Sequence, residues 1–181
     1  MRRISPISTS SRLIRDIGGV SIVEFALVAP VVLLLLFAEY ALCDAMSAKR
    51  KLTIATHTIG DLVARQTSVT STSLATYLSA ASQIAAPYSV SNMTIRIAEL
   101  STDNTGKTWV SWSSALNTTS LTTGVQFTLP AGLAQNNTSL IYSSSTYQFT
   151  PLLGASLFGT MTFTSQFYTY PRITNAVTYS N

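Results

Sequence analysis

A single apolar run, residues 20–43, limits what this chain can fold into more than any other feature of its sequence. Its only formal charges are Glu24 and Glu39. About 24 residues of α-helix extend roughly 36 Å, which is enough to cross a hydrocarbon layer about 30 Å thick. The uncharged part, residues 25–38, covers only about 14 residues and is too short to span that layer alone. We therefore expect one or both glutamates at or inside the membrane boundary.

The charge distribution separates the N-terminal tail from the rest of the chain. Only 10% of the 181 residues are charged, against about 25% in an ordinary soluble domain. Four of the eleven basic residues lie within the first fifteen positions: Arg2, Arg3, Arg12 and Arg15. Residues 1–19 contain these four arginines and Asp16, so the chain that follows them has seven basic and six acidic residues. It is nearly neutral and has no broad basic face to neutralise phosphates, so nucleic-acid binding is not expected.

The chain offers few side chains for catalysis or metal binding. Its one cysteine, Cys43, excludes an intrachain disulfide and a cysteine metal cluster. Its one histidine, His57, excludes most catalytic triads and zinc sites. Beyond Asp44 the sequence shows no paired acids, no serine-nucleophile motif and no phosphate-binding loop. We predict that the protein is not an enzyme and carries no cofactor or metal.

The first 45 residues are open to three interpretations. The first is an ordinary secretory signal, for which Cys43 and Ala45 would form a poor small-residue cleavage site after an over-long apolar region. The second is an uncleaved membrane anchor, which leaves Glu24 without a role. The third is a prepilin-type signal, in which a basic cytoplasmic leader is removed and the apolar run is kept as the helix of the mature protein.

The residues around Gly19 favour the prepilin-type signal. Gly19 precedes Val20, Glu24 is the fifth residue after that bond, and Phe25 follows it. Cleavage after Gly19 would turn the Val20 amide into an ammonium group, which the Glu24 carboxylate of a neighbouring, staggered helix can neutralise. Buried charges persist only when they are paired. Two alternatives stay open: Glu24 snorkels to the membrane interface, or cleavage follows Gly18 and makes Glu24 the sixth residue.

The stretch "GGVSIVEFALVAPVVLLLLFAEYAL" resembles the N-terminus of TadE/TadF-type pseudopilins, the minor pilins of the tight-adherence (Flp) pilus system. That family's motif is a glycine, four residues, a glutamate and then Phe or Tyr, followed by an apolar helix that usually contains a proline. Here these positions are occupied by Gly19, Glu24, Phe25 and Pro30. The resemblance continues in short downstream segments: His57–Thr70, Trp109–Leu116, Thr128–Leu133, Tyr147–Gly154 and Tyr170–Val177.

The resemblance implies partners and roles for these residues. The partners are a prepilin peptidase, other pilin or pseudopilin subunits, the pilus-assembly machinery and the lipid of the inner membrane. Gly19 and Val20 would form the cleaved bond, while Glu24 and Phe25 would take part in processing and subunit assembly.

The helical pattern continues beyond the basic run at residues 49–51. Apolar residues recur there at three-to-four spacing: Leu52, Ala55, Ile59, Leu62 and Val63. A continuous helix over residues 22–65 would be about 66 Å long. Gly60 is a candidate bend in it, and His57 lies off the apolar stripe, where we expect it in solvent.

A second helix and a set of strands are expected after the first helix. The helix covers residues 74–86, capped by Ser71 or Ser73 and ended by Pro87. Segments rich in Thr, Tyr and Phe then predict antiparallel strands with one solvated face. The strand candidates are residues 92–100, 108–112, 124–130, 140–151 and 159–171. Helices followed by strands without alternation indicate an α+β fold.

These patterns predict four regions. They are a basic cytoplasmic leader (1–19), a transmembrane helix (20–43), a helical region outside the membrane (44–87) and an antiparallel β-rich domain (88–181). We expect a single-pass protein of the bacterial inner membrane with a cytoplasmic N-terminus and a periplasmic C-terminal domain. By resemblance, it is a minor pilin or pseudopilin that helps to assemble a type IV-like tight-adherence pilus. The alternative is an uncleaved membrane anchor that displays an adhesin-like binding module.

Overall fold

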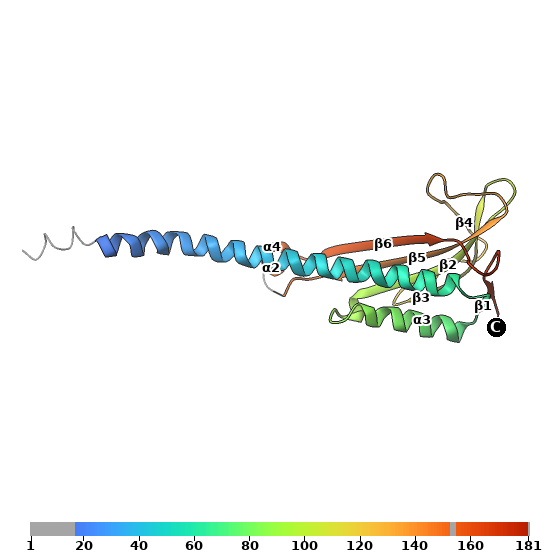
Figure 1. Cartoon of the computed structure of the whole chain (residues 1–181), viewed down its shortest axis with the longest axis horizontal. Helices are drawn as coiled ribbons and strands as arrows, with labels where there is room; N and C mark the ends of the chain where they lie inside the picture. The colour runs from blue at the N-terminus through green and yellow to red at the C-terminus, as the bar shows by residue number, and fades with distance from the viewer. Residues whose placement is uncertain (1–16, 153–154, 181) are drawn as a thin grey trace, which may run out of the picture.

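The structure is a computed structural model that describes residues 17–152 and 155–180. One long helix runs through most of the length of the molecule (Figure 1). Its C-terminal half lies along a β-sheet and beside a second helix, whereas its N-terminal half projects away from the domain. This arrangement confirms the α+β prediction. Most of the expected leader, residues 1–16, lies outside the described residues.

The long helix, α2 (Ile17–Ala64), is 48 residues long and contains Pro30. It passes through the expected membrane segment and the expected extramembrane helix without interruption. On its domain-facing side the buried residues recur every three or four positions. They are Ala41, Ala45, Ala48, Leu52, Ala55, Ile59 and Val63. This is the apolar stripe expected of a helix that covers a sheet, and it starts with three alanines, whose small side chains let neighbouring backbone approach closely.

The main sheet has five antiparallel strands in the order β4-β3-β2-β5-β6. Outside this sheet and α2, the elements are short apart from α3, which stands beside α2. In chain order after α2 the elements are β1 (Ser68–Val69), α3 (Ser71–Ile84), the 3₁₀ turn η1 (Val90–Asn92), β2 (Met93–Thr102), β3 (Thr108–Leu116), β4 (Gln126–Phe127), β5 (Thr138–Phe149), α4 (Ala155–Phe158), β6 (Met161–Thr169) and β7 (Thr178–Tyr179). The parallel pair β1–β7 was not expected from the sequence, because neither two-residue strand has a periodicity to detect.

The main core lies between the sheet and the two helices. Met93, Ile95 and Ile97 of β2 are fully buried in it, together with Leu74 and Leu78 of α3. Hydroxyl groups join α2 to β5 inside this core. The Ser143 hydroxyl donates to the Thr56 carbonyl oxygen (2.8 Å), and the Ser145 and Thr56 hydroxyls are hydrogen-bonded to each other. Small polar side chains therefore replace bulky apolar ones where the helix passes closest to the strand.

Gly60 has a packing role rather than the role of a bend. A Cβ atom at this position would lie 2.7 Å from Cδ1 of Phe167 and 2.9 Å from Oγ of Ser143. Helix α2 continues through Gly60 to Ala64. The glycine therefore lets the helix approach β5 and β6 more closely than any side chain would permit.

The start of α3 is capped by Thr70, not by Ser71 or Ser73 as expected. The backbone N–H of Ser73 donates to the Thr70 hydroxyl (3.1 Å), and the Thr70 N–H donates to the Ser73 hydroxyl (2.8 Å). This is a capping box, in which two hydroxyl residues satisfy each other's backbone donors. The sequence "TSTS" offers several hydroxyls, so spacing alone did not fix the cap.

The outer face of the sheet is less solvated than expected. Ala98 and Leu100 of β2 are fully buried in a second, smaller cluster. The chain between β3 and β5 supplies its cover through four half-buried side chains: Leu121, Phe127, Leu129 and Leu133. Strands β2 and β5 are consequently buried on both faces, whereas β6 alternates over its first six residues and β3 over its first five.

A β-bulge in β3 sets the positions of the two tryptophans. Trp112 pairs with Glu99 and Trp109 with Ser101, and the register shifts between them. Because Glu99 and Ser101 share one face of β2, the bulge brings both tryptophans to that face although they are three residues apart. Trp112 is 5% exposed and its indole Nε1 donates to the Val177 carbonyl oxygen (2.6 Å).

The buried carboxylate of Glu99 holds the C-terminal segment. The Val177 N–H donates to Glu99 Oε1 (2.9 Å), and Glu99 is 3% exposed. Burial raises the pKa of Glu99, and hydrogen bonds from Val177, Ser139 and Trp112 offset that rise only in part. No pattern in the sequence indicated this role, since Glu99 is one polar position among others in a predicted strand.

We expect Gly60→Ala to lower the free energy of unfolding by about 1–3 kcal/mol, the range for overpacking a filled site. The new methyl group must displace the Phe167 ring or the Ser143 hydroxyl. Urea unfolding of the detergent-solubilised chain, followed by the fluorescence of Trp109 and Trp112, measures the change. Gly19→Ala is the matched control, because a Cβ there meets nothing within 4 Å. Equal stability of the two variants would contradict the close approach.

We expect the domain to lose stability as the pH rises from the ordinary glutamate value of 4.5 through the raised pKa of Glu99. A raised folded-state pKa means that the folded protein binds the proton more tightly, so the stabilisation is complete below the ordinary value. Glu99→Gln keeps the acceptor oxygen for Val177 and should flatten this pH dependence. Thermal unfolding between pH 4 and 8 tests both statements, and an unchanged slope in the variant would refute the assignment to Glu99.

Candidate functional site

The N-terminal half of α2 stands free of the domain. From Val20 to Tyr40 its large apolar side chains are all exposed, Phe25 by 72% and Leu27 by 73%. The first fully buried side chain on the helix is Ala41. Among the described residues, α2 is the one helix long and apolar enough to cross a membrane, and its most apolar window has no part buried in the domain. A helix with this surface fits membrane anchoring.

The four residues singled out by the sequence lie together near the start of this helix. Gly19, Val20, Glu24 and Phe25 all belong to α2, and all four are exposed. Val20 and Glu24 are four residues apart and therefore lie on one side of the helix, one turn from each other. A Cβ atom added at Gly19 would meet no atom within 4 Å, so the fold itself does not require a glycine there.

Glu24 has no countercharge within the described part of the chain. The ion pairs there are Arg65–Asp61 and Arg172–Asp61, at the far end of α2. Glu24 is surrounded along the helix by Ile22, Val23 and Phe25, which are exposed by 59–72%. An unpaired charge in hydrocarbon is costly, so a carboxylate in this setting calls for a countercharge or for a place at the membrane boundary.

A polar contact joins α2 to the domain where the apolar segment ends. The Tyr88 hydroxyl donates to the Asp44 carboxylate (2.7 Å) and also lies 3.1 Å from the Asp44 carbonyl oxygen. Burial, and next the Asp44 carboxylate, raise the pKa of Tyr88 to about 12. Lys51 donates to the Ala86 carbonyl oxygen, and its ammonium lies 5.8 Å from the centre of the Tyr88 ring. Cys43, just before this contact, is exposed.

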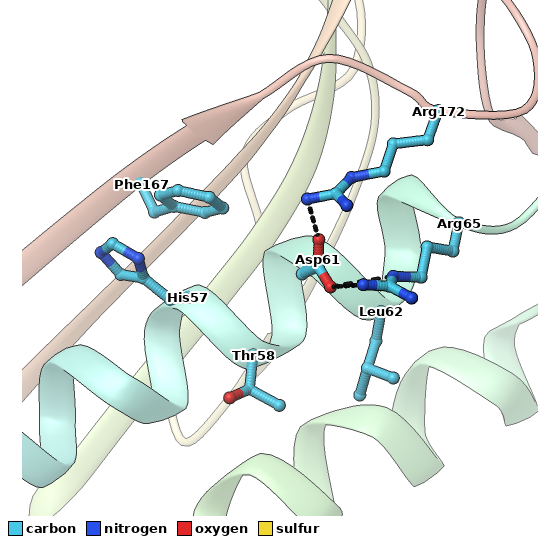
Figure 2. Close-up of a pocket in the computed structure, with 7 residues that line it drawn as sticks. All are labelled: His57, Thr58, Asp61, Leu62, Arg65, Phe167 and Arg172. Atoms are coloured by element: carbon cyan, nitrogen blue, oxygen red, sulfur yellow. Dashed lines mark hydrogen bonds and ion pairs between the residues drawn. The ribbon is translucent and has the colours of Figure 1, made fainter.

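A shallow pocket of about 470 Å³ opens beside the C-terminal part of α2. Figure 2 shows the His57 imidazole against the Phe167 ring of β6 and Asp61 between two arginines. The His57 and Phe167 rings are stacked, with centroids 4.1 Å apart. His57 is exposed, as expected from its place off the apolar stripe. The sequence did not indicate its aromatic partner, which lies on a distant strand.

The charges of this pocket cancel largely within it. Arg65 contacts the Asp61 carboxylate at 2.8 Å, and Arg172 forms an ion pair with the other carboxylate oxygen. Both guanidinium groups are more than half exposed, so these pairs contribute little to stability. Arg172 also donates its backbone N–H to the Ala64 carbonyl oxygen (2.7 Å), which fastens the C-terminal segment to the end of α2.

The pocket does not contain the parts of a catalytic site. Its lining has one acid, already paired, and one exposed histidine, with no cysteine or paired carboxylates. Within residues 17–152 and 155–180, no group of three His, Cys, Asp or Glu side chains could hold a metal ion.

The architecture defines a class: an α+β domain carried on an apolar helix suited to membrane anchoring. Residues 19–59 of the chain match the family model of TadE-like proteins. This confirms the resemblance carried by Gly19, Glu24 and Phe25, and the chain contains a TadE-like domain. Such proteins are components of Tad pilus systems and not an enzyme family. No curated protein and no solved structure matches the chain.

The matched segment coincides with α2 up to the Ile59 turn. It includes the uncovered part of the helix from Gly19 onward and the part around Thr56 that packs on β5. It ends at Ile59, so the downstream resemblance, in residues 60–70 and in the segments from Trp109 onward, stays a prediction. The family match thus concerns the helix with its exposed acid, and it places the chain in the context of pilus assembly with other pilus components.

Proposed function

We propose that this protein is a minor pilin or pseudopilin that helps to assemble a tight-adherence (Flp) pilus. The observation that carries the proposal is Glu24, an exposed acid without a countercharge among the described residues, in the uncovered half of a helix that matches TadE-like proteins. A membrane anchor alone has no need of a carboxylate at this depth. A helix that assembles with copies or relatives of itself does, because the acid can be paired across subunits.

In the proposed mechanism, a prepilin peptidase cuts the bond between Gly19 and Val20. The open space around Gly19 supports this role, since glycine at that position disfavours the helix by about 1 kcal/mol relative to alanine without any packing reason. Cleavage gives Val20 a free ammonium group. On a neighbouring helix displaced by about one turn, the Glu24 carboxylate can reach that ammonium and neutralise it. Phe25, exposed beside Glu24, supplies apolar contact between the two helices.

The proposed topology follows from the same division of the chain. Residues 1–19 form the cytoplasmic leader, residues 20–43 cross the inner membrane, and residues 44–87 and 88–181 form the periplasmic part. The arginines of the leader favour a cytoplasmic N-terminus under the positive-inside rule, although the basic run at residues 49–51 partly offsets them. Incorporation into the pilus and contact with the assembly machinery would follow removal of the leader.

The second candidate function is a static anchor with an adhesin-like domain, displayed by an uncut helix. The exposed aromatic side chains of the β-rich region are compatible with adhesion, but among the described residues they do not line one common pocket. The N-terminal sequence of the membrane-extracted protein separates the two: a start at Val20 supports the pilin, and a start at Met1 supports the anchor.

We expect Gly19→Ala to abolish processing and, with it, pilus assembly. The extra methyl group meets no atom of the protein within 4 Å, so the fold should be unchanged while the peptidase loses its substrate residue. Mass spectrometry of the extracted protein measures cleavage directly. Gly18→Ala is the matched control and should be cleaved normally. Loss of cleavage in Gly18→Ala alone would move the cut to the bond after Gly18.

We expect Glu24→Ala to be processed at Val20 but to fail in assembly, because the neighbour's ammonium group then has no counterion. Electron microscopy of pili on cells that carry the variant provides the measurement. Glu39→Gln removes the other carboxylate of the apolar helix and should leave assembly intact. Normal piliation in Glu24→Ala would rule out the pairing role, and an equal defect in Glu39→Gln would show that position 24 is not special.

A further inference from the structure

The connection between β5 and β6 reaches the apolar half of α2. Thr56 of the helix contacts Ser145 of β5, and Leu152 follows seven residues later in the chain. Seven residues of strand extend roughly 23 Å, which equals about 15 residues of helix. Because β5 and α2 run in opposite directions, Leu152, three residues beyond the end of β5 at Phe149, can reach the level of about residue 41 on the helix. Figure 1 shows α4, in the same connection, at this end of the domain.

Two further observations place the connection at the same level. The Phe149 ring, at the end of β5, lies 6.2 Å from the Tyr88 ring, and Tyr88 is hydrogen-bonded to Asp44. The chain after Phe149 therefore begins beside Asp44 and continues towards the apolar half. Ala41 is only 3% exposed, so the domain covers one side of α2 as far as this turn.

The surface at this level is apolar on both the helix and the connection. Leu152 is 83% exposed and Phe158 is 41% exposed, while Leu42 and Met46 project from α2 with exposures above 60%. We call these four residues the apolar collar. No Asp, Glu, Lys or Arg occurs between Lys107 and Arg172, so the connection carries no charge that would keep it in water.

We propose that the apolar collar lies in the lipid interface, so that the domain contacts the membrane through Leu152 and Phe158 as well as through α2. The inference rests on the proposed function to the extent that α2 must span the membrane. Exposed Leu and Phe side chains beside the end of a membrane span belong to the interface, where apolar side chains lie below polar headgroups. The exposed basic side chains of Lys49 and Arg50, about one turn further along α2, lie where they can meet anionic headgroups.

Lipid is the occupant favoured over a second copy of the chain. The collar surrounds the point where α2 would leave the membrane, so lipid is present there in every state of the isolated protein. A second copy would have to approach with its own helix in the same orientation and displace that lipid. Two contacts with the membrane also restrict the tilt of the domain relative to α2, which a single helix does not.

Site-directed spin labelling of the full chain in vesicles of phosphatidylethanolamine and phosphatidylglycerol tests the proposal. Cys43→Ser removes the one native cysteine, and single cysteines then replace Leu152 or Phe158. Val125 and Ile173, which are exposed by 52% and 63%, provide matched control positions away from the collar. Fluorescence of Trp109 and Trp112 verifies that each labelled variant is folded.

We expect labels at positions 152 and 158 to collide with oxygen several-fold more, relative to a water-soluble nickel complex, than labels at positions 125 and 173. Equal nickel accessibility at all four positions would overturn the proposal, and so would protection from both reagents, which indicates cover by a second copy. A label at position 33 separates this failure from failure of the proposed function. If that label is also in water, α2 does not span the membrane and both proposals fall.

Discussion

The packing of α2 against β5 and β6 is the interaction on which the rest of the structure depends. One continuous helix serves two environments, because its N-terminal half is uncovered and its C-terminal half forms the core. Small residues make this contact close: alanines at the start of the stripe, Gly60 near its end, and the hydroxyl groups of Thr56 and Ser143 between them. Without that contact, the part of the inner face that α2 covers would be exposed, and only the chain that leaves the helix at Ala64 would hold the domain to the anchor.

The parts of this structure that local pattern determines could be predicted from the sequence. The length of the apolar run, the three-to-four spacing after it and the strand-like segments from Met93 onward gave the long helix, the second helix and the antiparallel sheet. Gly19 and Glu24 were found for a chemical reason, since a carboxylate in an apolar helix calls for a partner. The family match to residues 19–59 supports the resemblance, whereas the roles of these two residues rest on the proposed experiments.

The features that sequence reasoning missed depend on register and tertiary contact. Glu99 became a buried anchor because the C-terminal segment brings the Val177 N–H to it. The tryptophans share a face because a bulge shifts the pairing by one residue. The outer cluster around Ala98 and Leu100 forms because the chain between β3 and β5 folds back over the sheet. None of these arrangements produces a periodic pattern in the sequence. The Glu99 and outer-cluster contacts join residues far apart in the chain, and the position of the tryptophans depends on a one-residue shift in strand pairing.

The direction of α2 along β5 has a mechanical consequence. The contacts between the two elements, from Thr56 with Ser145 to Gly60 with Ser143, follow one another along the helix axis. A force that draws the helix along its axis loads all of these contacts together and in shear. A force across the axis would instead peel them apart one by one. The domain is thus oriented to resist traction through its anchor and to yield more readily to sideways bending.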